Sequence, residues 1–178
     1  MFRTTIAAIA VLFIASTAHA EDAKNYYIEG QFGSTVNADD GRDNSSVMGL
    51  ALGKDFGKVR VDLAGVRNSS GDNTSLGEVE VDSLLTGVYY DINTNSKFTP
   101  FVGINLGYGW ADGTGVSTVD DAGFVYGASA GVGYAVADNI DLIARYQYLT
   151  SDDITVTNLS GTDKWDTQAI TAGLRFKF

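Results

Sequence analysis

Apolar and polar residues alternate in eight segments of this chain, and turn-rich stretches separate the segments. The segments lie at residues 25–33, 46–54, 58–67, 78–90, 99–110, 123–135, 140–149 and 166–178. A period of two places successive side chains on opposite faces of a β-strand. In the fifth segment, Val102 and Ile104 face one way, whereas Gly103 and Asn105 face the other. The pattern therefore predicts eight strands, each with an apolar and a polar face.

The connectors between these segments alternate in length. Those after the second, fourth and sixth segments are short, whereas residues 34–45, 68–77, 111–122 and 150–165 form longer connectors. Short periplasmic turns and long external loops are typical of barrels in the bacterial outer membrane. The sequence therefore predicts an all-β fold, an eight-stranded antiparallel transmembrane β-barrel. We expect it to be a monomer in contact with outer-membrane lipid and lipopolysaccharide.

The fourth segment does not keep one kind of residue on each face. Glu78, Glu80 and Asp82 share a face that Leu84 then continues. A β-bulge or a change of face near Ser83 would reconcile the two halves, because one extra residue reverses the alternation that follows. On this interpretation Glu80 points into the barrel.

The first 20 residues have the pattern of a secretory signal peptide. Arg3 provides a positive charge, residues 6–15 are apolar, and residues 18–20 form an A-x-A cleavage site. The apolar run is too short to span a bilayer core of about 30 Å. We therefore expect a signal peptide at residues 1–20 and a barrel domain at residues 21–178.

The last nine residues alternate as well, and they end on an aromatic side chain. Their spacing, polar-x-Gly-x-x-aromatic-x-apolar, is similar to the C-terminal signal that the barrel-assembly machinery reads in outer-membrane proteins. The matching residues are Thr171, Gly173, Phe176 and Phe178. We therefore expect that machinery to be a partner during assembly.

The composition opposes several kinds of chemistry. The chain has no Cys, and its single His, His19, falls in the expected signal peptide. The barrel domain therefore lacks thiolate and imidazole groups for metal binding and for nucleophilic or acid–base catalysis. The formal net charge of −10 opposes binding to nucleic acid, whose phosphates require Lys and Arg. We expect no enzymatic activity, no cofactor, no metal and no nucleic-acid partner.

Charged residues on the polar faces of the predicted strands form a candidate lumen charge cluster. Its members are Glu29, Arg60, Asp62, Glu80, Arg145 and Arg175. The interior of an eight-stranded barrel is barely wide enough for side chains, so paired acids and bases are expected to plug it. A conductive pathway and a carboxylate-based catalytic cluster are the alternative interpretations.

The longer connectors are rich in carboxylates, among them Asp39, Asp72, Asp120 and Asp152. Oxygen-rich loops can hold Ca²⁺, but none of these connectors has the D-x-[DN]-x-[DN]-G spacing of a calcium loop. A solvated, charged external surface is the simpler interpretation. Divalent ions that bridge the loops to lipopolysaccharide phosphates are the alternative.

Two longer blocks of sequence resemble a known family. Residues 99–109, TPFVGINLGYG, and residues 141–149, DLIARYQYL, are similar to the opacity-protein-like, or porin-like, family of small outer-membrane β-barrels. The resemblance extends over essentially all of residues 21–178. It implies eight antiparallel strands, periplasmic termini and four variable external loops, and it carries over no catalytic residue. Some members of that family act as adhesins or surface antigens.

These patterns favour a structural or interaction role at the cell surface. In this role the external loops would contact a host or surface ligand, lipopolysaccharide or other envelope components. A narrow porin-like channel for ions or small solutes is the alternative function. A soluble lipid-binding barrel with its apolar faces turned inward is a third, which the C-terminal signal opposes.

Overall fold

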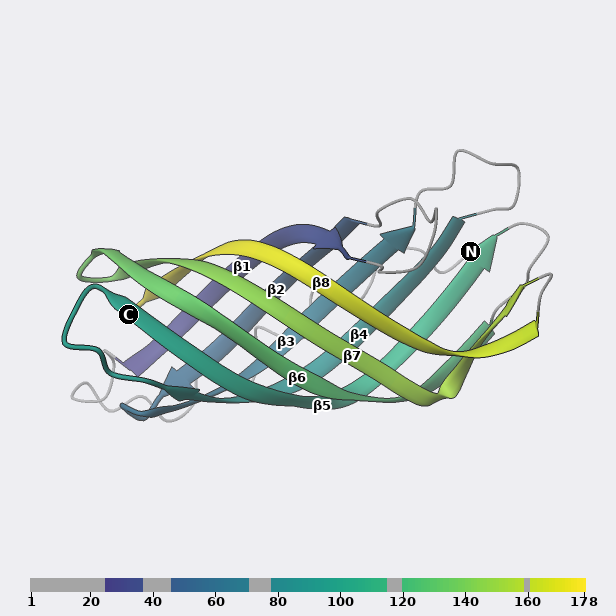
Figure 1. The fold of residues 1–178 in the computed structure, drawn as a ribbon, viewed down its shortest axis with the longest axis horizontal. Coiled ribbons are helices and arrows are strands. Elements are labelled where there is room, and N and C mark those ends of the chain that lie inside the picture. Colours follow the sequence, from purple (N-terminus) through teal and green to yellow (C-terminus); the bar gives the residue numbers. More distant parts are fainter. Residues whose placement is uncertain (1–24, 37–45, 71–77, 115–119, 159–160) are drawn as a thin grey trace.

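The computed structural model describes residues 25–36, 46–70, 78–114, 120–158 and 161–178. The expected signal peptide lies outside them. The described residues form a closed barrel in which every strand is antiparallel to its neighbours and β8 pairs with β1 (Figure 1). The strands are β1 Tyr26–Thr35, β2 Ser46–Asp55, β3 Val59–Ser70, β4 Glu78–Asp91, β5 Phe98–Thr114, β6 Asp120–Ala137, β7 Ile140–Asn158 and β8 Gly161–Lys177. The predicted eight-stranded antiparallel barrel is thereby confirmed.

The two ends of the barrel differ in their connectors. The short connectors β2–β3, β4–β5 and β6–β7 lie at one end together with Phe178, and we call this the turn end. Gly57 in the β2–β3 connector has a φ of 95°, a conformation that glycine adopts without a steric penalty. The opposite end, which carries the longer connectors, is called the loop end. No helix in the described ranges is long and apolar enough to cross a membrane.

Strands β7 and β8 continue farther toward the loop end than the sequence predicts. Their pairing includes Thr155 with Lys164 and Asn158 with Gly161, so most of the connector predicted at residues 150–165 is a hairpin. Only Ile154 and Val156 alternate with polar residues in residues 150–165, and this run is too short to predict a strand. Backbone pairing does not require that alternation.

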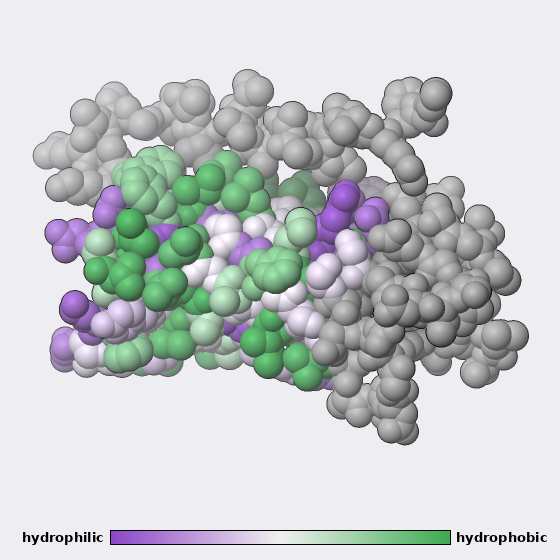
Figure 2. Space-filling model, turned by 90° about the horizontal axis from the view of Figure 1, so that it is seen from above, coloured by the Kyte–Doolittle hydropathy of each residue, from purple (hydrophilic) through white to green (hydrophobic). Residues whose placement is uncertain are grey.

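Adjacent side chains along each strand face opposite sides of the barrel wall. Ile104 is 57% exposed, whereas its neighbour Asn105 is 1% exposed. Apolar side chains such as Leu50, Leu174 and Phe176 are likewise exposed, and Figure 2 shows apolar side chains gathered over the outer surface. So large an exposed apolar surface is unfavourable in water and suits contact with lipid.

Strand β4 runs without a bulge, which corrects the prediction for Glu80. Its pairing with β3 and β5 is continuous, and Val81, Ser83 and Leu85 all point into the barrel. Glu80 therefore shares the outer face with Leu84, and the prediction that it lies in the lumen is wrong. The outer face changes from apolar to charged near the loop end, where a strand leaves the lipid and meets water.

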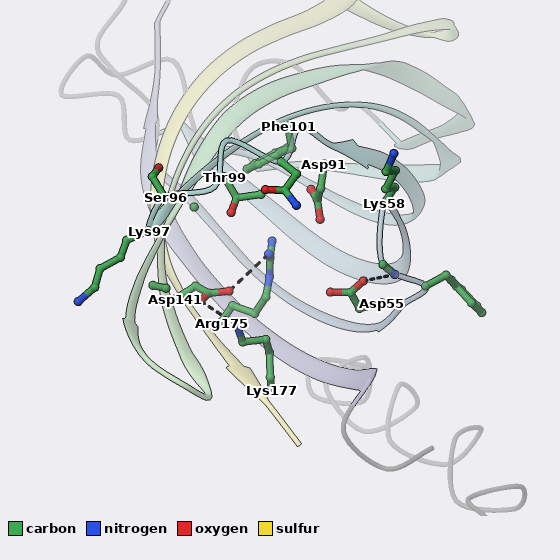
Figure 3. Close-up of a pocket in the computed structure, with 15 residues that line it drawn as sticks. Asp55, Lys58, Asp91, Ser96, Lys97, Thr99, Phe101, Asp141, Arg175 and Lys177 are labelled. Carbon is green, nitrogen blue, oxygen red and sulfur yellow. Dashed lines mark hydrogen bonds and ion pairs between the residues drawn. The ribbon is translucent and has the colours of Figure 1, made fainter. Parts of the chain in front are cut away.

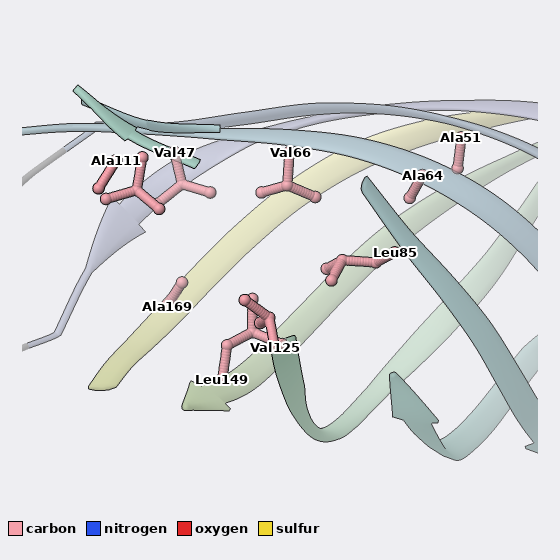
Figure 4. Close-up of a cluster of buried hydrophobic side chains, with 10 residues drawn as sticks. Val47, Ala51, Ala64, Val66, Leu85, Ala111, Val125, Leu149 and Ala169 are labelled. Atoms are coloured by element: carbon pink, nitrogen blue, oxygen red, sulfur yellow. The ribbon is translucent and has the colours of Figure 1, made fainter. Parts of the chain in front are cut away.

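The interior is packed in two different layers. The layer near the turn end contains buried charged and aromatic side chains, with Arg60, Glu29 and Tyr89 each about 1% exposed. The layer near the loop end is a cluster of aliphatic side chains (Figure 4). This cluster consists of Val47, Ala51, Ala64, Val66, Val81, Leu85, Ala111, Val125, Leu149 and Ala169. The charged interior predicted from the sequence thus occupies only one half of the lumen.

Glycines on the inner face make room for aromatic rings in the turn-end layer. A Cβ atom at Gly53 would overlap the ring of Tyr27, and one at Gly103 would overlap the ring of Tyr89. The narrow lumen therefore holds large rings where the neighbouring strand contributes no side chain.

Candidate functional site

Glu29 is the centre of the buried charge network. Its Oε1 accepts a hydrogen bond from Arg145 Nη2 at 2.6 Å, and its Oε2 accepts hydrogen bonds from Arg175 Nη2 at 2.6 Å and Nε at 2.9 Å. Arg145 Nη1 also donates to Gln31 Oε1 at 3.1 Å. Strands β1, β7 and β8, which are neighbours in the barrel, supply these side chains, and one carboxylate therefore links three adjacent strands inside the lumen.

Arg60 forms a second ion pair closer to the turn end. Its Nε and Nη2 donate to the two carboxylate oxygens of Asp91 at 2.6 and 2.8 Å, which is the bidentate geometry of strong pairs. The Arg60 guanidinium also lies 5.1 Å from the ring centroid of Tyr89 and 5.0 Å from that of Phe101. These distances are typical of cation–π contacts, which partly replace the lost hydration of the buried cation.

Asp62 and Asn105 extend the network through hydroxyl groups. Tyr27 donates its phenolic hydrogen to Asp62 Oδ2 at 3.0 Å. Tyr89 donates to Asn105 Oδ1 at 2.9 Å, and Asn105 Nδ2 donates to Ser129 at 2.7 Å. The hydroxyl group of Tyr27 on β1 therefore holds an acid of β3, and that of Tyr89 on β4 holds an amide of β5.

The charges of the turn-end layer balance. The cations are Arg60, Arg145, Arg175 and Lys177, and the anions are Glu29, Asp62, Asp91 and Asp141. A buried cluster of equal and opposite charges avoids the large cost of an uncompensated ion in a low-dielectric interior. Such a cluster is suited to filling and bracing the lumen.

Five of the six predicted cluster residues lie together in this layer: Glu29, Arg60, Asp62, Arg145 and Arg175. Glu80 does not join them. Sequence reasoning missed Asp91, because it lies where β4 ends in a turn, and it missed the rings of Tyr89 and Phe101 that contact the arginines. Tyr89 lies two residues beyond Gly87 and four beyond Leu85, so all three face inward. The period of two along β4 would therefore have predicted that Tyr89 lies in the lumen.

The turn end opens into a polar cavity of about 590 Å³. Figure 3 shows the Arg175 guanidinium pointing into it, with Asp141 and Lys177 close by and Asp55 on another side. Lys177 Nζ donates to Asp141 Oδ1 at 3.0 Å. Among the described residues, no group of three or more His, Cys, Asp or Glu side chains is placed to hold a metal ion.

The residues that match the assembly signal lie along β8 and directly after it. Thr171 points inward and donates to Gln31 Oε1 at 3.2 Å, whereas the rings of Phe176 and Phe178 are exposed on the outer face and stack with centroids 6.4 Å apart. The Phe178 amide also donates to the carbonyl of Tyr26 at 2.9 Å. The role of these residues in assembly stays a prediction.

Comparison with known proteins defines the class. The chain matches the outer membrane protein beta-barrel domain family over residues 5–178 and belongs to that family. It is therefore an outer-membrane β-barrel protein, and the predicted location is confirmed. Because the short turns of such barrels are periplasmic, the turn end faces the periplasm and the loop end faces the outside.

Individual relatives share the fold at low identity. Neisserial surface protein A (NspA) has a TM-score of 0.71 and 23% identity, covering 86% of this chain and 97% of that one. The attachment invasion locus protein (Ail) of Yersinia pestis has a TM-score of 0.54 and 20% identity, covering 86% of this chain and 99% of that one. Another structure of Ail contains the heparin analogue sucrose octasulfate.

A relative of known sequence matches over a shorter stretch. The outer membrane protein PagN of Salmonella typhimurium is 26% identical over 91 residues. That match covers 45% of this chain and 38% of PagN.

Proposed function

We propose that this protein is a closed barrel that acts at the cell surface through its external loops and carries no flux of solutes. The filled interior is the observation that supports the proposal. The turn-end layer contains large side chains such as Arg60, Tyr27 and Phe101, all at most 2% exposed. The aliphatic layer follows toward the loop end, and the polar side chains buried beside it, Asn68, Ser83 and Ser151, carry no charge. An ion crossing this layer would lose most of its hydration without meeting a group of opposite charge.

The negative charge of the loop end favours basic partners or divalent cations. Residues 36–45, 67–82, 112–121 and 151–166 together contain 14 Asp and Glu but three Arg and Lys. Because so acidic a surface repels polyanions, the heparin analogue found on Ail is a poor guide to the ligand of this chain. We infer that the loops contact basic surfaces of host or envelope proteins, or lipopolysaccharide phosphates through divalent cations.

Conductance measurements test the closed barrel. The refolded protein in planar bilayers should show no steady single-channel conductance, whereas Leu85→Ser, which places a hydroxyl group in the aliphatic layer, should raise the frequency of brief openings. Heat-modifiable gel mobility on the same samples verifies folding. Reproducible conductance of the unaltered protein would overturn the proposal.

A narrow channel is the second candidate, and unpartnered polar atoms favour it. Among the described residues, Arg60 Nη1, Asp62 Oδ1 and Arg145 Nε are buried without a hydrogen-bond partner. Buried polar atoms of this kind usually bind ordered water, which indicates hydrated space beside the network. If the protein conducts, Arg145→Gln should shift its selectivity toward cations; a selectivity unchanged by this substitution would argue against conduction through the network.

Binding to lipopolysaccharide is tested with vesicles. Refolded protein in detergent should bind lipopolysaccharide-containing vesicles in Mg²⁺ and lose that binding in EDTA, while phospholipid vesicles should show no such dependence. Binding to these vesicles that EDTA does not reduce would rule out divalent cations as the bridge between the loops and lipopolysaccharide. In that case the search would turn to basic protein partners.

We also propose that Phe178 takes part in recognition by the assembly machinery. Deleting Phe178 should reduce the amount of folded barrel in the outer membrane while export to the periplasm continues. The matched control is Phe56→Ala, which removes an exposed ring at the same end of the barrel. Undiminished assembly after the deletion would contradict the role of this residue.

A further inference from the structure

We propose that the cavity at the turn end binds a small zwitterion, an amino acid or short peptide that carries both an ammonium and a carboxylate group. The cavity faces the periplasm, so this site is separate from the loops on which the proposed surface function depends. Its volume of about 590 Å³ falls within the range of ligand pockets. Two observations support the proposal. The cavity walls carry opposite charges, and some of these charged groups have hydrogen-bond donors or acceptors left over after their contacts within the barrel.

One wall offers cationic donors that the barrel does not fully use. Arg175 donates its Nε and Nη2 hydrogens to Glu29, but its Nη1 has only a 3.9 Å contact with Asp141 Oδ2. Lys177 Nζ donates to Asp141 Oδ1 and has two further hydrogens. Figure 3 shows the Arg175 guanidinium directed into the cavity. These donors are placed to receive a ligand carboxylate.

Another wall offers acceptors. Asp55 Oδ1 accepts a hydrogen bond from the Gly57 amide at 2.7 Å, and within the described part of the chain its Oδ2 has no partner. Asp91 lines the same cavity with its carboxylate fixed by Arg60. Figure 3 shows Asp55 and Asp91 across the cavity from the Asp141–Lys177 pair. A ligand ammonium group is therefore best placed beside Asp55.

The overall balance of the lining distinguishes a zwitterion from other ligands. Three acids, Asp55, Asp91 and Asp141, and four bases, Lys58, Lys97, Arg175 and Lys177, line the cavity. Figure 3 shows the Lys97 ammonium directed away from the cavity, so a metal cation would meet chiefly Arg175 and Lys177, and a polyanion would meet the three carboxylates. A molecule with separated opposite charges satisfies both walls at once, and the ring of Phe101 gives the cavity an apolar contact.

Two sources of such ligands exist in the periplasm: free peptides and the stem peptides of the cell wall, whose diaminopimelate unit carries an ammonium and carboxylates. Binding to the refolded full barrel is measured by calorimetry with a soluble stem tripeptide that ends in diaminopimelate, and with dialanine. Stronger binding of the tripeptide would assign the site to the cell wall, and equal binding would assign it to free peptides.

Variants and modified peptides test the proposed contacts. Lys177→Gln and Asp55→Asn should each weaken binding about tenfold, which is the effect of one hydrogen bond between charged groups. Acetylating the ammonium group of the ligand should also weaken binding to the unaltered protein about tenfold. In Asp55→Asn the acetylated and the unmodified ligand should bind with the same affinity, because the carboxylate that the ammonium contacts is already absent. The matched controls are Lys54→Gln, whose ammonium lies over the outer rings of Tyr26 and Phe56, and Asp138→Asn in the β6–β7 turn.

The proposal is overturned if blocked and unblocked peptides bind equally, if the controls weaken binding as much as the cavity variants, or if binding does not saturate by about 10 mM. The blocked peptides probe the unaltered protein, so this arm of the test stands even where a variant folds poorly.

Discussion

The two halves of the barrel interior are filled by different physical means. The turn-end half holds directional ion pairs, in which Glu29 alone receives three hydrogen bonds from two arginines. The loop-end half holds small aliphatic side chains such as Val66, Leu85 and Val125. Removing one partner of a buried ion pair leaves an uncompensated charge, whereas trimming an apolar side chain weakens the packing only by the volume that it vacates. One short lumen is therefore closed by ion pairs in one half and by apolar packing in the other.

Removing the central carboxylate should have the largest effect. Glu29→Gln keeps the side-chain volume but leaves Arg145 and Arg175 buried without their anion, so the free energy of unfolding should fall by about 3–5 kcal/mol. Urea titration of the barrel in lipid vesicles measures the change. The matched control Glu80→Gln alters an acid on the outer face and should cost less than about 0.5 kcal/mol. Equal losses of unfolding free energy in Glu29→Gln and Glu80→Gln would show that burial in the lumen does not make a carboxylate more important for stability.

Truncating the aliphatic layer should cost somewhat less. Leu85 is 1% exposed, and Leu85→Ala should lower the free energy of unfolding by about 3 kcal/mol because it leaves a cavity in a packed layer. Its neighbour Leu84 faces outward, so Leu84→Ala is the matched control and should cost clearly less, since lipid can occupy the space. The same titration compares them. A larger loss at Leu84 would show that the loop-end half is not a packed core.

The smallest effect should come from an ion pair outside both layers. Arg67 and Asp82 form a bidentate pair on the outer face at 2.6 and 2.7 Å, but the Arg67 side chain is 47% exposed. Arg67→Gln should therefore cost at most about 1 kcal/mol, and the cost should shrink as salt screens the pair. Urea titrations at low and high ionic strength measure this. A salt-independent cost as large as that of Glu29→Gln would contradict the dependence on burial.

Much of the charged site was predictable from local pattern. Glu29, Asp62 and Arg145 were found because each lies on the polar face of an alternating strand. Glu80 was misplaced because the outer face is itself charged above the lipid, so the polarity of a residue near the loop end does not identify its side of the wall. Asp91 was absent from the predicted cluster because it follows the predicted end of the fourth strand, and Asp141 was absent because pairing across strands depends on register.

The aliphatic layer and the turn-end cavity were not predicted for a related reason. Val66 and Val125 are apolar residues on faces that elsewhere carry polar ones, and a pattern rule assigns apolar residues to lipid. Their burial becomes evident only when the closed barrel brings β3 and β6 to face each other across the lumen. The cavity likewise forms from residues at the ends of separate strands.

The sequence by itself determined the number of strands, their alternating faces and the alternation of short and long connectors, because these depend on spacing along one chain. Tertiary structure alone decided which charges pair, which apolar residues close the lumen and where the periplasmic cavity lies. These properties depend on closure of the sheet and on the register of each strand against its neighbours, which bring together residues distant in sequence such as Glu29 and Arg175.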